Sequence, residues 1–383
     1  MLFKQGSISL NDVLNRHKFI SLVVHSLLLL FLYSIRLMKR FSVYNTGNIV
    51  VISLHRLGDT VFTIPAIREI LKRFNDKITI VCFPESIPIY NLAFKDVNFY
   101  ELEQEAFYFG RRIAKKGLRK KIKKLKPQII FDLTGSMISA SIIFNIRAKE
   151  IIGTNAAQFR SIYHKFVTFR EKPQLIDIYL DAISSVIQIP AEIKLSKQPI
   201  SLSQNGKILI HPFAGWKEKE WNFKKFISLV EKIKSDYQVS LITPKGFLSN
   251  DVIEEIMNIQ IEIIQTNSVA DLIRSIKECS IFIGNDSGPV NIANFIGKPT
   301  LTVYGSTNPE YTSTTLEHQI YTQKILNCSS HKNEKLCIIN APVDKCPGIQ
   351  CMQYLTVDEV YNNVINLARK YCKMNLDSND VLK

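Results

Sequence analysis

The residues of this chain that are best suited to chemistry form a polar corner, GNDSGP, at residues 284–289. Asp286 or Ser287 can cap the helix that Gly288 opens, and the free amide groups of its first turn form an anion site. A second predicted strand ends in GST, which adds the hydroxyl of Thr307 at the same sheet edge. A single corner of this kind is more often only a turn than a binding site. Two at adjacent strand ends favour a site that binds an anion.

A third corner, HPFAGWKEKEWN, carries two lysines after the first predicted strand of the second half. Lys217 and Lys219 lie there beside Trp221. The compact charge of a lysine can neutralise a diphosphate. The plain alternative is a solvated pair of lysines on a loop that Trp221 packs in place.

A fourth corner places an arginine and an aspartate between a predicted strand and a predicted helix in the first half. The segment ISLHRLGDTVFTIPAIREI is apolar up to HRLGD, and a helical pattern with Pro65 in its first turns begins at once. In open α/β sheets, ligands bind at the carboxyl ends of strands. Gly58 allows another group to approach the backbone closely. Arg56 either binds an acidic group of a ligand or only fixes the loop, and Asp59 stands beside it.

Strand and helix patterns alternate on either side of these corners. Unbroken β-branched and apolar runs predict strands at residues 48–54, 77–83, 128–133, 207–211, 238–243, 280–284 and 299–304, and helices at 222–235 and 268–278. Unbroken apolar strands separated by helices indicate parallel sheets covered on both faces. We therefore expect an α/β protein with two strand-helix domains that face each other across a ligand cleft.

Domain boundaries follow from length and from a change in composition. A chain of 383 residues is too long for one ordinary core. Prolines, serines and polar residues replace the periodic pattern at 189–207, which indicates a linker. We predict a separate segment at 1–45, domains at 46–190 and 207–352, a linker at 191–206 and a C-terminal helix and tail at 353–383. That helix is expected to pack back on the first domain.

The charge of the chain points to an anionic partner. It carries 49 lysines and arginines against 34 acids, a formal net charge of +15, which suits nucleic acid, a phosphorylated substrate or a membrane surface. Ten basic residues and no acid lie in RRIAKKGLRKKIKKLK, residues 111–126. This predicted helix is either a solvated face or docks on anionic lipid headgroups or an acidic substrate. Nucleic acid is disfavoured because no recognised signature accompanies the charge.

The amino-terminal segment FISLVVHSLLLLFLYSI, residues 19–35, is apolar with basic flanks. Its length is at the short limit for spanning a bilayer, and no small-residue cleavage site follows, which argues against a signal peptide. We expect an anchor or an interfacial helix. The alternative is a helix packed on the protein itself.

Cysteines and known motifs exclude several classes. Cys328, Cys337, Cys346 and Cys351 cluster without a CxxC pair, so a zinc site is weakly supported and reduced cysteines are expected. No GxGxxG follows a strand, and GxxxxGK[ST], HExxH and GxSxG are absent from the sequence. An NAD enzyme, a P-loop kinase and the commonest hydrolases are therefore disfavoured.

Taken in order, the corners resemble one family. LxRLGDxxxxxPAIRxL, KxWxxxxF and GNDSGPxxxAxxxGKPTxxxYGxTxP, with the ending CPGIQCMQYLTVDEV, are similar to motifs of bacterial glycosyltransferase family 9, the ADP-heptose:lipopolysaccharide heptosyltransferases and their relatives. The resemblance spans about residues 48–371. It implies the GT-B fold, two Rossmann-like domains of which the first binds the acceptor and the second the nucleotide-sugar. It also implies inversion at the anomeric carbon, with no cofactor and no required metal.

The resemblance also assigns roles residue by residue. Asp59 matches the general base, with Arg56 and Gly58 on the acceptor side. The donor contacts match the residues Lys219, Asp286, Ser287 and Gly288, with Thr307 close by. In one departure, Asn291 stands where the family commonly has histidine. Histidine can carry a proton that asparagine cannot, so donors other than ADP-heptose stay open.

These implications lead to one expected function and two alternatives. We expect transfer of a heptose or related sugar from a nucleotide-diphosphate donor to a lipid-linked, phosphorylated acceptor, the lipopolysaccharide core or a related surface glycan. The expected location is the cytoplasmic face of the inner membrane, on its anionic surface, bound peripherally or through the N-terminal segment. The alternatives are a non-catalytic scaffold that binds nucleotide-sugars and a nucleotide-sugar epimerase.

Overall fold

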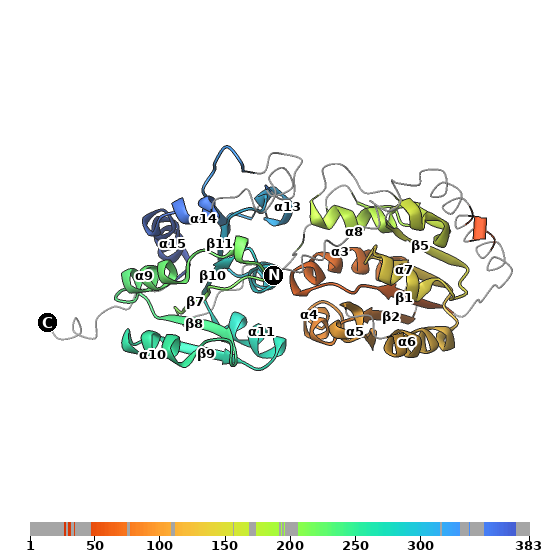
Figure 1. Cartoon of the computed structure of the whole chain (residues 1–383), viewed down its shortest axis with the longest axis horizontal. Helices are drawn as coiled ribbons and strands as arrows, with labels where there is room; N and C mark the ends of the chain where they lie inside the picture. Colours follow the sequence, from red (N-terminus) through yellow and green to blue (C-terminus); the bar gives the residue numbers. More distant parts are fainter. Residues whose placement is uncertain are drawn as a thin grey trace, which may run out of the picture.

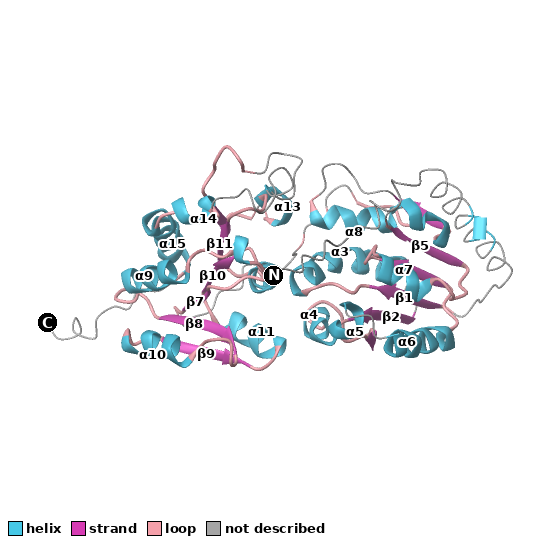
Figure 2. Ribbon diagram, viewed as in Figure 1, coloured by secondary structure: helices cyan, strands magenta, loops and turns pink. Residues whose placement is uncertain are grey.

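The molecule contains two six-stranded parallel sheets (Figure 1). The computed structural model describes residues 47–74, 77–108, 112–155, 157–167, 174–190, 193, 195, 206–314, 316–329, 337 and 348–372, together with the isolated positions 27, 30, 31 and 34. The strand orders are β3-β2-β1-β4-β5-β6 and β12-β11-β10-β7-β8-β9. Every strand pair is parallel, and Figure 2 shows helices on both faces of each sheet. This confirms the predicted α/β class.

The first sheet is built around β1 (Asn48–Ile52), whose residues point alternately to two apolar layers. Its other strands are β2 (Lys77–Cys82), β3 (Asn98–Glu101), β4 (Ile129–Asp132), β5 (Glu150–Thr154) and β6 (Lys165–Val167). Ile49 and Val51 join one buried cluster, whereas Val50 and Ile52 join the other. Since side chains alternate along a strand, an unbroken apolar run buries both faces of the sheet.

Helices cover both faces of this sheet. They are α3 (Leu57–Phe74), α4 (Ile87–Tyr90), α5 (Gln104–Tyr108), α6 (Arg112–Leu125), α7 (Met137–Ile143) and α8 (Leu175–Ser184). The basic stretch is helical as expected. Leu118 and Ile122 of α6 are buried, whereas Lys116, Lys120 and Lys124 are exposed. Apolar residues four apart hold α6 on the sheet and leave a charged outer face.

The second sheet repeats the plan. Its strands are β7 (Ile208–His211), β8 (Val239–Pro244), β9 (Glu262–Thr266), β10 (Ile281–Asn285), β11 (Thr300–Tyr304) and β12 (Gln319–Gln323). Its helices are α9 (Phe223–Ile233), α10 (Asn250–Asn258), α11 (Val269–Glu278), α12 (Gly288–Ile296), α13 (Pro309–Thr312), α14 (Gln350–Tyr354) and α15 (Val357–Tyr371). The two central strands, β7 and β10, are completely buried.

The C-terminal helix α15 packs on the second half of the molecule. It contacts α9 and the strands β10, β11 and β12, and Val360 and Val364 are buried in one cluster with Phe226 and Ile208. The prediction that this helix returns to the first domain was therefore wrong. The physical reason is that α9 exposes an apolar face toward α15 beside the second sheet, and burying two such faces together is favourable.

The two halves meet where α3 lies against α12. In Figure 1, α3, α4 and α8 of the first half face α11 and α13 of the second. A Cβ atom placed on Gly288 would lie 3.0 Å from Cβ of Leu57 and 3.1 Å from the amide nitrogen of Gly58. Only glycines allow the two helix starts to come this close.

The predicted N-terminal apolar helix lies outside the described residues, apart from four isolated helical positions. Within the described part of the chain, no helix combines the length and the apolar character needed to cross a membrane.

Candidate active site

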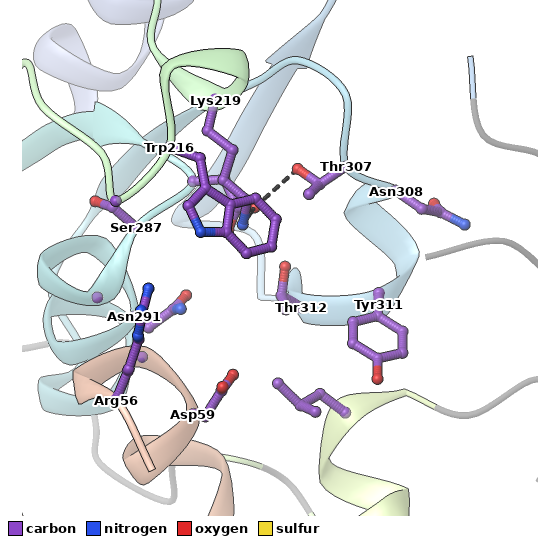
Figure 3. A pocket seen from close by; sticks show the side chains of 15 residues that line it. Arg56, Asp59, Trp216, Lys219, Ser287, Asn291, Thr307, Asn308, Tyr311 and Thr312 are labelled. Atoms are coloured by element: carbon purple, nitrogen blue, oxygen red, sulfur yellow. Dashed lines mark hydrogen bonds and ion pairs between the residues drawn. The ribbon is translucent and has the colours of Figure 1, made fainter. Parts of the chain in front are cut away.

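All eight residues that the sequence predicted for the site line one cavity of about 180 Å³ between the two halves (Figure 3). Arg56, Gly58 and Asp59 come from the first half. The second half contributes the other five: Lys219, Asp286, Ser287, Gly288 and Thr307. The carboxyl ends of β1, β10 and β11 therefore meet around one space, as expected for facing parallel sheets.

The corner that carries Asp59 is fixed by buried hydroxyl groups. The Thr60 hydroxyl lies 3.0 Å from the carbonyl of Arg56 and 3.0 Å from the hydroxyl of Ser86. One turn on, Thr63 lies 3.0 Å from the hydroxyl of Tyr90. Asp59 itself lies in the first turn of α3, where the helix dipole favours negative charge. The hydrogen bonds of Thr60 and Thr63 thus hold the backbone that carries the Asp59 carboxylate in a fixed position.

A half-buried histidine, His55, is the first residue of this corner. Its ring contacts the ring of Tyr179 edge-on, with centroids 5.1 Å apart, and one ring nitrogen lies 3.2 Å from the carbonyl oxygen of Leu133. Burial lowers the pKa of His55, an effect larger than the opposing pull of the Asp59 charge. His55 is therefore a neutral support for the corner. The role of His55 was not predicted, because the charged residues Arg56 and Asp59 are the ones in HRLGD whose types point to ligand binding.

On the opposite wall, Lys219 and Asp286 form an ion pair. The Nζ atom of Lys219 lies 2.6 Å from Oδ2 of Asp286, and the hydroxyl of Thr307 donates a 2.8 Å hydrogen bond to the same oxygen. The side chain of Asp286 is only 4% exposed, against 20% for Lys219. Trp216 covers the ammonium group, which lies 5.1 Å from the centre of the indole ring. The pair holds Lys219 at the cavity with donor hydrogens still available.

The start of α12 differs in one respect from the expected cap. Ser287 occupies the N-cap position but makes no side-chain capping bond, and Asp286 is engaged by Lys219 and Thr307. The expectation that either side chain caps the helix was wrong. The Ser287 hydroxyl is buried with no hydrogen-bond partner in the described structure. An uncapped helix start beside an unused hydroxyl is well suited to an anion.

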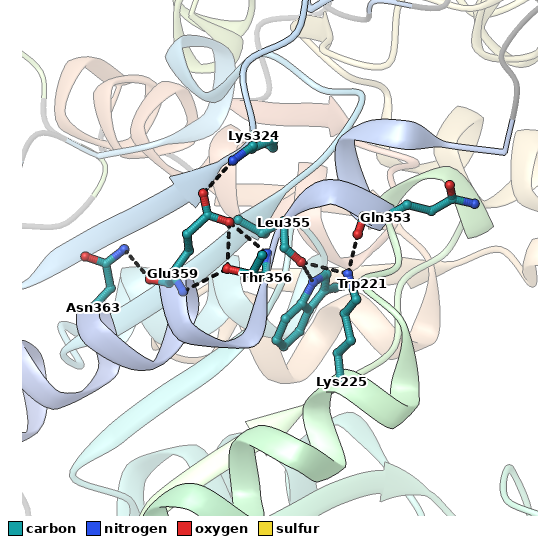
Figure 4. Close-up of polar contacts among 8 residues, drawn as sticks. All are labelled: Trp221, Lys225, Lys324, Gln353, Leu355, Thr356, Glu359 and Asn363. Carbon is teal, nitrogen blue, oxygen red and sulfur yellow. Dashed lines mark hydrogen bonds and ion pairs between the residues drawn. The ribbon is translucent and has the colours of Figure 1, made fainter.

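The loop that carries Lys219 is tied down from two sides. Asn285 at the end of β10 accepts a 3.0 Å hydrogen bond from the Trp221 amide and donates one of 2.8 Å to the carbonyl of Pro212. The indole nitrogen of Trp221 donates a 3.0 Å bond to the carbonyl of Leu355, as Figure 4 shows. Lys225 reaches the same carbonyl, at 2.7 Å. The C-terminal segment therefore braces the lysine loop.

Seven further residues line the cavity that sequence analysis did not assign to the site. They are Leu175, Gly215, Trp216, Asn291, Asn308, Tyr311 and Thr312. Asn291 stands where the family motif commonly has histidine, and Asn308 to Thr312 directly follow the GST corner. Burial raises the pKa of Tyr311 to about 12, and the charge of Asp59 adds to this effect. It lies in the second half, so only folding brings it near Asp59.

A larger cavity of about 520 Å³ opens beside the first and shares Arg56, Gly58, Gly215, Ser287 and Gly288 with it. Its walls include the apolar residues Phe213, Ile242, Phe247, Val269, Leu272 and Pro289 and the polar residues Thr243, Thr266, Asn267 and Ser268. The rings of Phe213 and Phe247 meet edge-on, with centroids 4.7 Å apart. An apolar slot with a few polar groups, next to an anion site, fits a planar base attached to phosphates.

His211 also lines this larger cavity. It is 8% exposed, and its Nδ1 atom has no hydrogen-bond partner in the part of the chain that the structure describes. Burial lowers the pKa of His211 to about 4. The ring is therefore neutral at physiological pH.

The cysteine cluster is only partly described. Cys328 is exposed, Cys337 is half-buried and Cys351 is buried, whereas Cys346 lies outside the described residues. Among the residues that are described, no three histidine, cysteine or acidic side chains gather closely enough to hold a metal ion.

The chain is similar to known proteins over most of its length. It matches glycosyltransferase family 9 (heptosyltransferase) over residues 116–341. Lipooligosaccharide heptosyltransferase 2 of Campylobacter jejuni is 24% identical over 344 residues, which cover 82% of this chain and 96% of that protein.

Solved structures show the same fold. The ADP-heptose lipopolysaccharide heptosyltransferase II of E. coli has a TM-score of 0.66 at 16% identity, covering 84% of this chain and 99% of that one. A family 9 glycosyltransferase of Veillonella parvula has a TM-score of 0.65 at 16% identity, covering 84% and 97%. E. coli heptosyltransferase WaaC, solved with ADP-2-deoxy-2-fluoro heptose, has a TM-score of 0.60 at 13% identity, covering 83% and 99%. These likenesses confirm the predicted GT-B arrangement.

Proposed function

Because the chain belongs to glycosyltransferase family 9, we propose that it transfers a heptose or a related sugar to the lipopolysaccharide core or a related surface glycan. Family membership makes it a glycosyltransferase, and the proposal concerns the donor, the acceptor and the residues that act. The observation that carries it is the single cavity that Asp59 shares with Lys219, Asp286 and Thr307. A carboxylate on one wall and a cation on the other match the two ends of a displacement reaction.

In the proposed reaction, Asp59 takes the proton of an acceptor hydroxyl. The freed oxygen attacks the anomeric carbon of the donor sugar and forms the new glycosidic bond. The bond between that carbon and the diphosphate breaks on the opposite side, and its electron pair leaves with the diphosphate. Lys219 and the amides at the start of α12 stabilise the negative charge that develops there. The configuration at the anomeric carbon is inverted.

The donor is proposed to lie along the two adjoining cavities. The nucleotide base of the donor occupies the larger cavity between Phe213 and Val269, and the diphosphate lies at the start of α12. The sugar then enters the smaller cavity, between Lys219 and Asp59. ADP-heptose is the first candidate because a similar structure was solved with an ADP-heptose analogue. Asn291 lines the cavity proposed for the sugar. Its neutral amide replaces a histidine that can carry a proton, so other sugar donors should also be tested.

The acceptor is proposed to be lipid-linked and phosphorylated, at the cytoplasmic face of the inner membrane. Support comes from the exposed lysines of α6, which belong to the same half as Asp59. Lysines on one helix face are attracted to anionic headgroups and phosphates. The apolar segment before residue 47 is proposed to strengthen this association, either as an anchor or as an interfacial helix.

A transfer assay tests the proposal directly. Purified protein is incubated with ADP-heptose and with lipopolysaccharide from a heptose-deficient bacterium, and both ADP release and acceptor mass are measured. We expect ADP release that depends on the acceptor and a mass gain of one sugar. A scaffold would release no nucleotide. An epimerase would convert the donor in the absence of acceptor. Either result, no release of nucleotide or conversion of the donor without acceptor, would contradict the proposal.

A further inference from the structure

We propose that Arg56 binds the diphosphate of the donor, so that the first half of the molecule takes part in donor recognition. This inference rests on the proposed function, because it concerns the same two cavities. The family resemblance implies an acceptor role for Arg56, and the place of its side chain between the cavities favours a donor role instead. Tyr108 is a positioning residue that holds the guanidinium group of Arg56.

Arg56 lies where the two cavities join. Among the described residues that line both of them, Arg56 alone carries a charge. The others are Gly58, Gly215, Ser287 and Gly288. Lys219 lines the small cavity but not the large one. Because a diphosphate connects the sugar of the donor to its nucleoside, a donor that occupies both cavities places its phosphates at this junction.

The start of α12 lies directly beside the corner that carries Arg56. A Cβ atom on Gly58 would lie 3.1 Å from Nδ2 of Asn291 and 3.7 Å from the amide nitrogen of Gly288. Figure 3 shows the Arg56 side chain beside Asn291, on the side of the cavity where Ser287 lies, whereas the carboxylate of Asp59 points to a different part of the cavity.

A diphosphate at the junction therefore meets positive groups from both halves. The second half offers the amides of the uncapped helix start and the unused Ser287 hydroxyl. The first half offers the guanidinium of Arg56, whose planar fork of N–H donors matches the geometry of phosphate oxygens.

The guanidinium of Arg56 is free to bind such a ligand. The side chain is exposed, and within the part of the chain that the structure describes it forms no salt bridge. An acidic partner would have to be displaced before an anion could bind, whereas Arg56 has none to lose.

An aromatic side chain of α5 holds the guanidinium in place. Its carbon Cζ lies 5.6 Å from the centre of the Tyr108 ring. That ring meets the buried ring of Phe107 edge-on, with centroids 4.9 Å apart. Arginine can lie on an aromatic face and still donate hydrogen bonds from its edge. Tyr108 therefore limits the motion of Arg56 without using its donors.

The first test is the kinetics of Arg56→Gln in the transfer assay. The hydrogen bonds of a cation to a phosphate are worth about tenfold in binding or more. We expect the donor KM to rise about tenfold, with the acceptor KM within twofold and the melting temperature unchanged.

Arg73→Gln is the matched control. Arg73 is exposed at the other end of α3, outside both cavities, and its Cζ also lies 5.6 Å from the centre of an aromatic ring, that of Phe74. The substitution removes the same charge and should change neither constant. An equal effect of the two substitutions would overturn the inference, because it would reflect the net charge of the protein.

The second test measures binding without transfer, by calorimetric titration of ADP, GDP, UDP and CDP, each compared with its own nucleoside. For the nucleoside diphosphate that binds most tightly, Arg56→Gln should weaken binding about tenfold and leave binding of the nucleoside within twofold. Tyr108→Leu should weaken binding of the diphosphate about threefold, whereas Tyr108→Phe, which keeps the aromatic face, should bind like the wild-type protein.

The outcomes separate this inference from the proposed function. A raised acceptor KM in Arg56→Gln, with the donor KM and diphosphate binding unchanged, would overturn the inference while the proposed function stands. A wild-type protein that binds no nucleoside diphosphate more tightly than its nucleoside would also overturn it. If the wild-type protein binds a nucleoside diphosphate but transfers no sugar, the proposed function fails, and a tenfold weaker Kd for Arg56→Gln still supports the inference.

Discussion

Gly58 and Gly288 touch across the boundary between the two halves of the molecule. A Cβ atom on Gly288 would lie 3.1 Å from the amide nitrogen of Gly58, and one on Gly58 would lie 3.4 Å from Cα of Gly288. Each glycine is a neighbour in sequence of a residue that lines the cavity, Asp59 on one side and Ser287 on the other. The contact therefore sets the separation between the proposed base and the proposed diphosphate site.

Gly288→Ala should lower the activity strongly while leaving the protein folded. The added methyl group meets backbone atoms that cannot move aside, so α3 and α12 must separate by a few tenths of an ångström or more. Small misplacements of reacting groups can cost about 100-fold in rate, whereas a strained contact costs about 1–3 kcal/mol of stability. We expect kcat/KM to fall at least about 50-fold in the transfer assay.

Gly117→Ala is the matched control for this change. A Cβ on Gly117 meets nothing within 4 Å, and the residue lies inside helix α6. Alanine is favoured over glycine in a helix by about 0.5–1 kcal/mol, so the melting temperature should rise slightly at full activity. Equal activity of the two variants would show that the contact between the halves is not needed for transfer.

Lys219→Gln should weaken donor binding. The substitution removes the cation from the donor wall and leaves the buried Asp286 without its charged partner. We expect the donor KM to rise about tenfold or more and the acceptor KM to stay within twofold, measured by ADP release at varied donor and acceptor. Lys217→Gln changes the same charge at an exposed position two residues away and should leave both constants unchanged. An equal effect at both positions would point to the net charge of the loop.

Asp132 should make the stability of the protein depend on pH. This buried carboxyl accepts hydrogen bonds from Tyr163 at 2.6 Å and Ser139 at 2.8 Å, yet burial raises its pKa to about 6 from an ordinary 3.8. Folding therefore takes up a proton between these values. The contribution of this group is fully present below pH 3.8 and is lost as the pH rises through about 6, a change of about 3 kcal/mol at most.

The check is urea unfolding of the wild-type protein and of Asp132→Asn at several pH values from 4 to 7. The amide nitrogen of asparagine cannot accept the hydrogen bonds that a carboxyl oxygen of Asp132 accepts, so the variant is less stable at pH 4. Because asparagine does not ionise, the difference between the two proteins should shrink as the pH rises and the wild-type protein loses stability. A difference that stays constant over this range would show that Asp132 does not titrate in the folded protein.

The charged face of α6 should direct the protein to anionic membranes. Lys116, Lys120 and Lys124 are exposed and four residues apart, so they lie on one side of the helix. Replacing all three with glutamate should reduce cosedimentation with vesicles that contain anionic lipid by at least about tenfold, with little effect on neutral vesicles. Replacing them with arginine is the control and should preserve binding.

The N-terminal segment is tested separately by deletion of residues 1–45 and cell fractionation. Loss of membrane association would assign the attachment to that segment. If association is unchanged in the deletion and is lost in the glutamate variant, α6 carries it.

The sequence predicted the central strands and the corners of the site, and the reasons are physical. β1, β7 and β10 are buried on both faces, so their apolar runs are unbroken. The strands that were missed include β3 and β9, which lie at sheet edges and have exposed polar residues around only two half-buried aromatic or apolar ones. A run of two such residues is too short to predict a strand, and pairing with the neighbouring strand makes these segments strands.

The missing parts of the site depend on contacts between distant segments. Tyr311 acquires a position near Asp59 only because α13 packs against α8, and nothing in the local sequence reports that. The docking of α15 was mispredicted for the same reason, since its apolar face fits either half in principle. The positions of Asp59, Lys219 and Asp286 could be predicted because each lies after a buried strand with an unbroken apolar run: β1, β7 and β10, respectively.

The central claim is that Asp59 takes the proton of the acceptor hydroxyl, and Asp59→Asn tests it most directly. Asparagine has nearly the same shape but cannot accept the proton, and a missing general base costs about 100- to 10,000-fold. The measurement is kcat for transfer of the donor sugar, together with the donor Kd from thermal-shift titration. We predict that kcat falls at least about 100-fold while the donor Kd stays within twofold. A variant that transfers sugar at more than about a tenth of the wild-type rate would contradict the account.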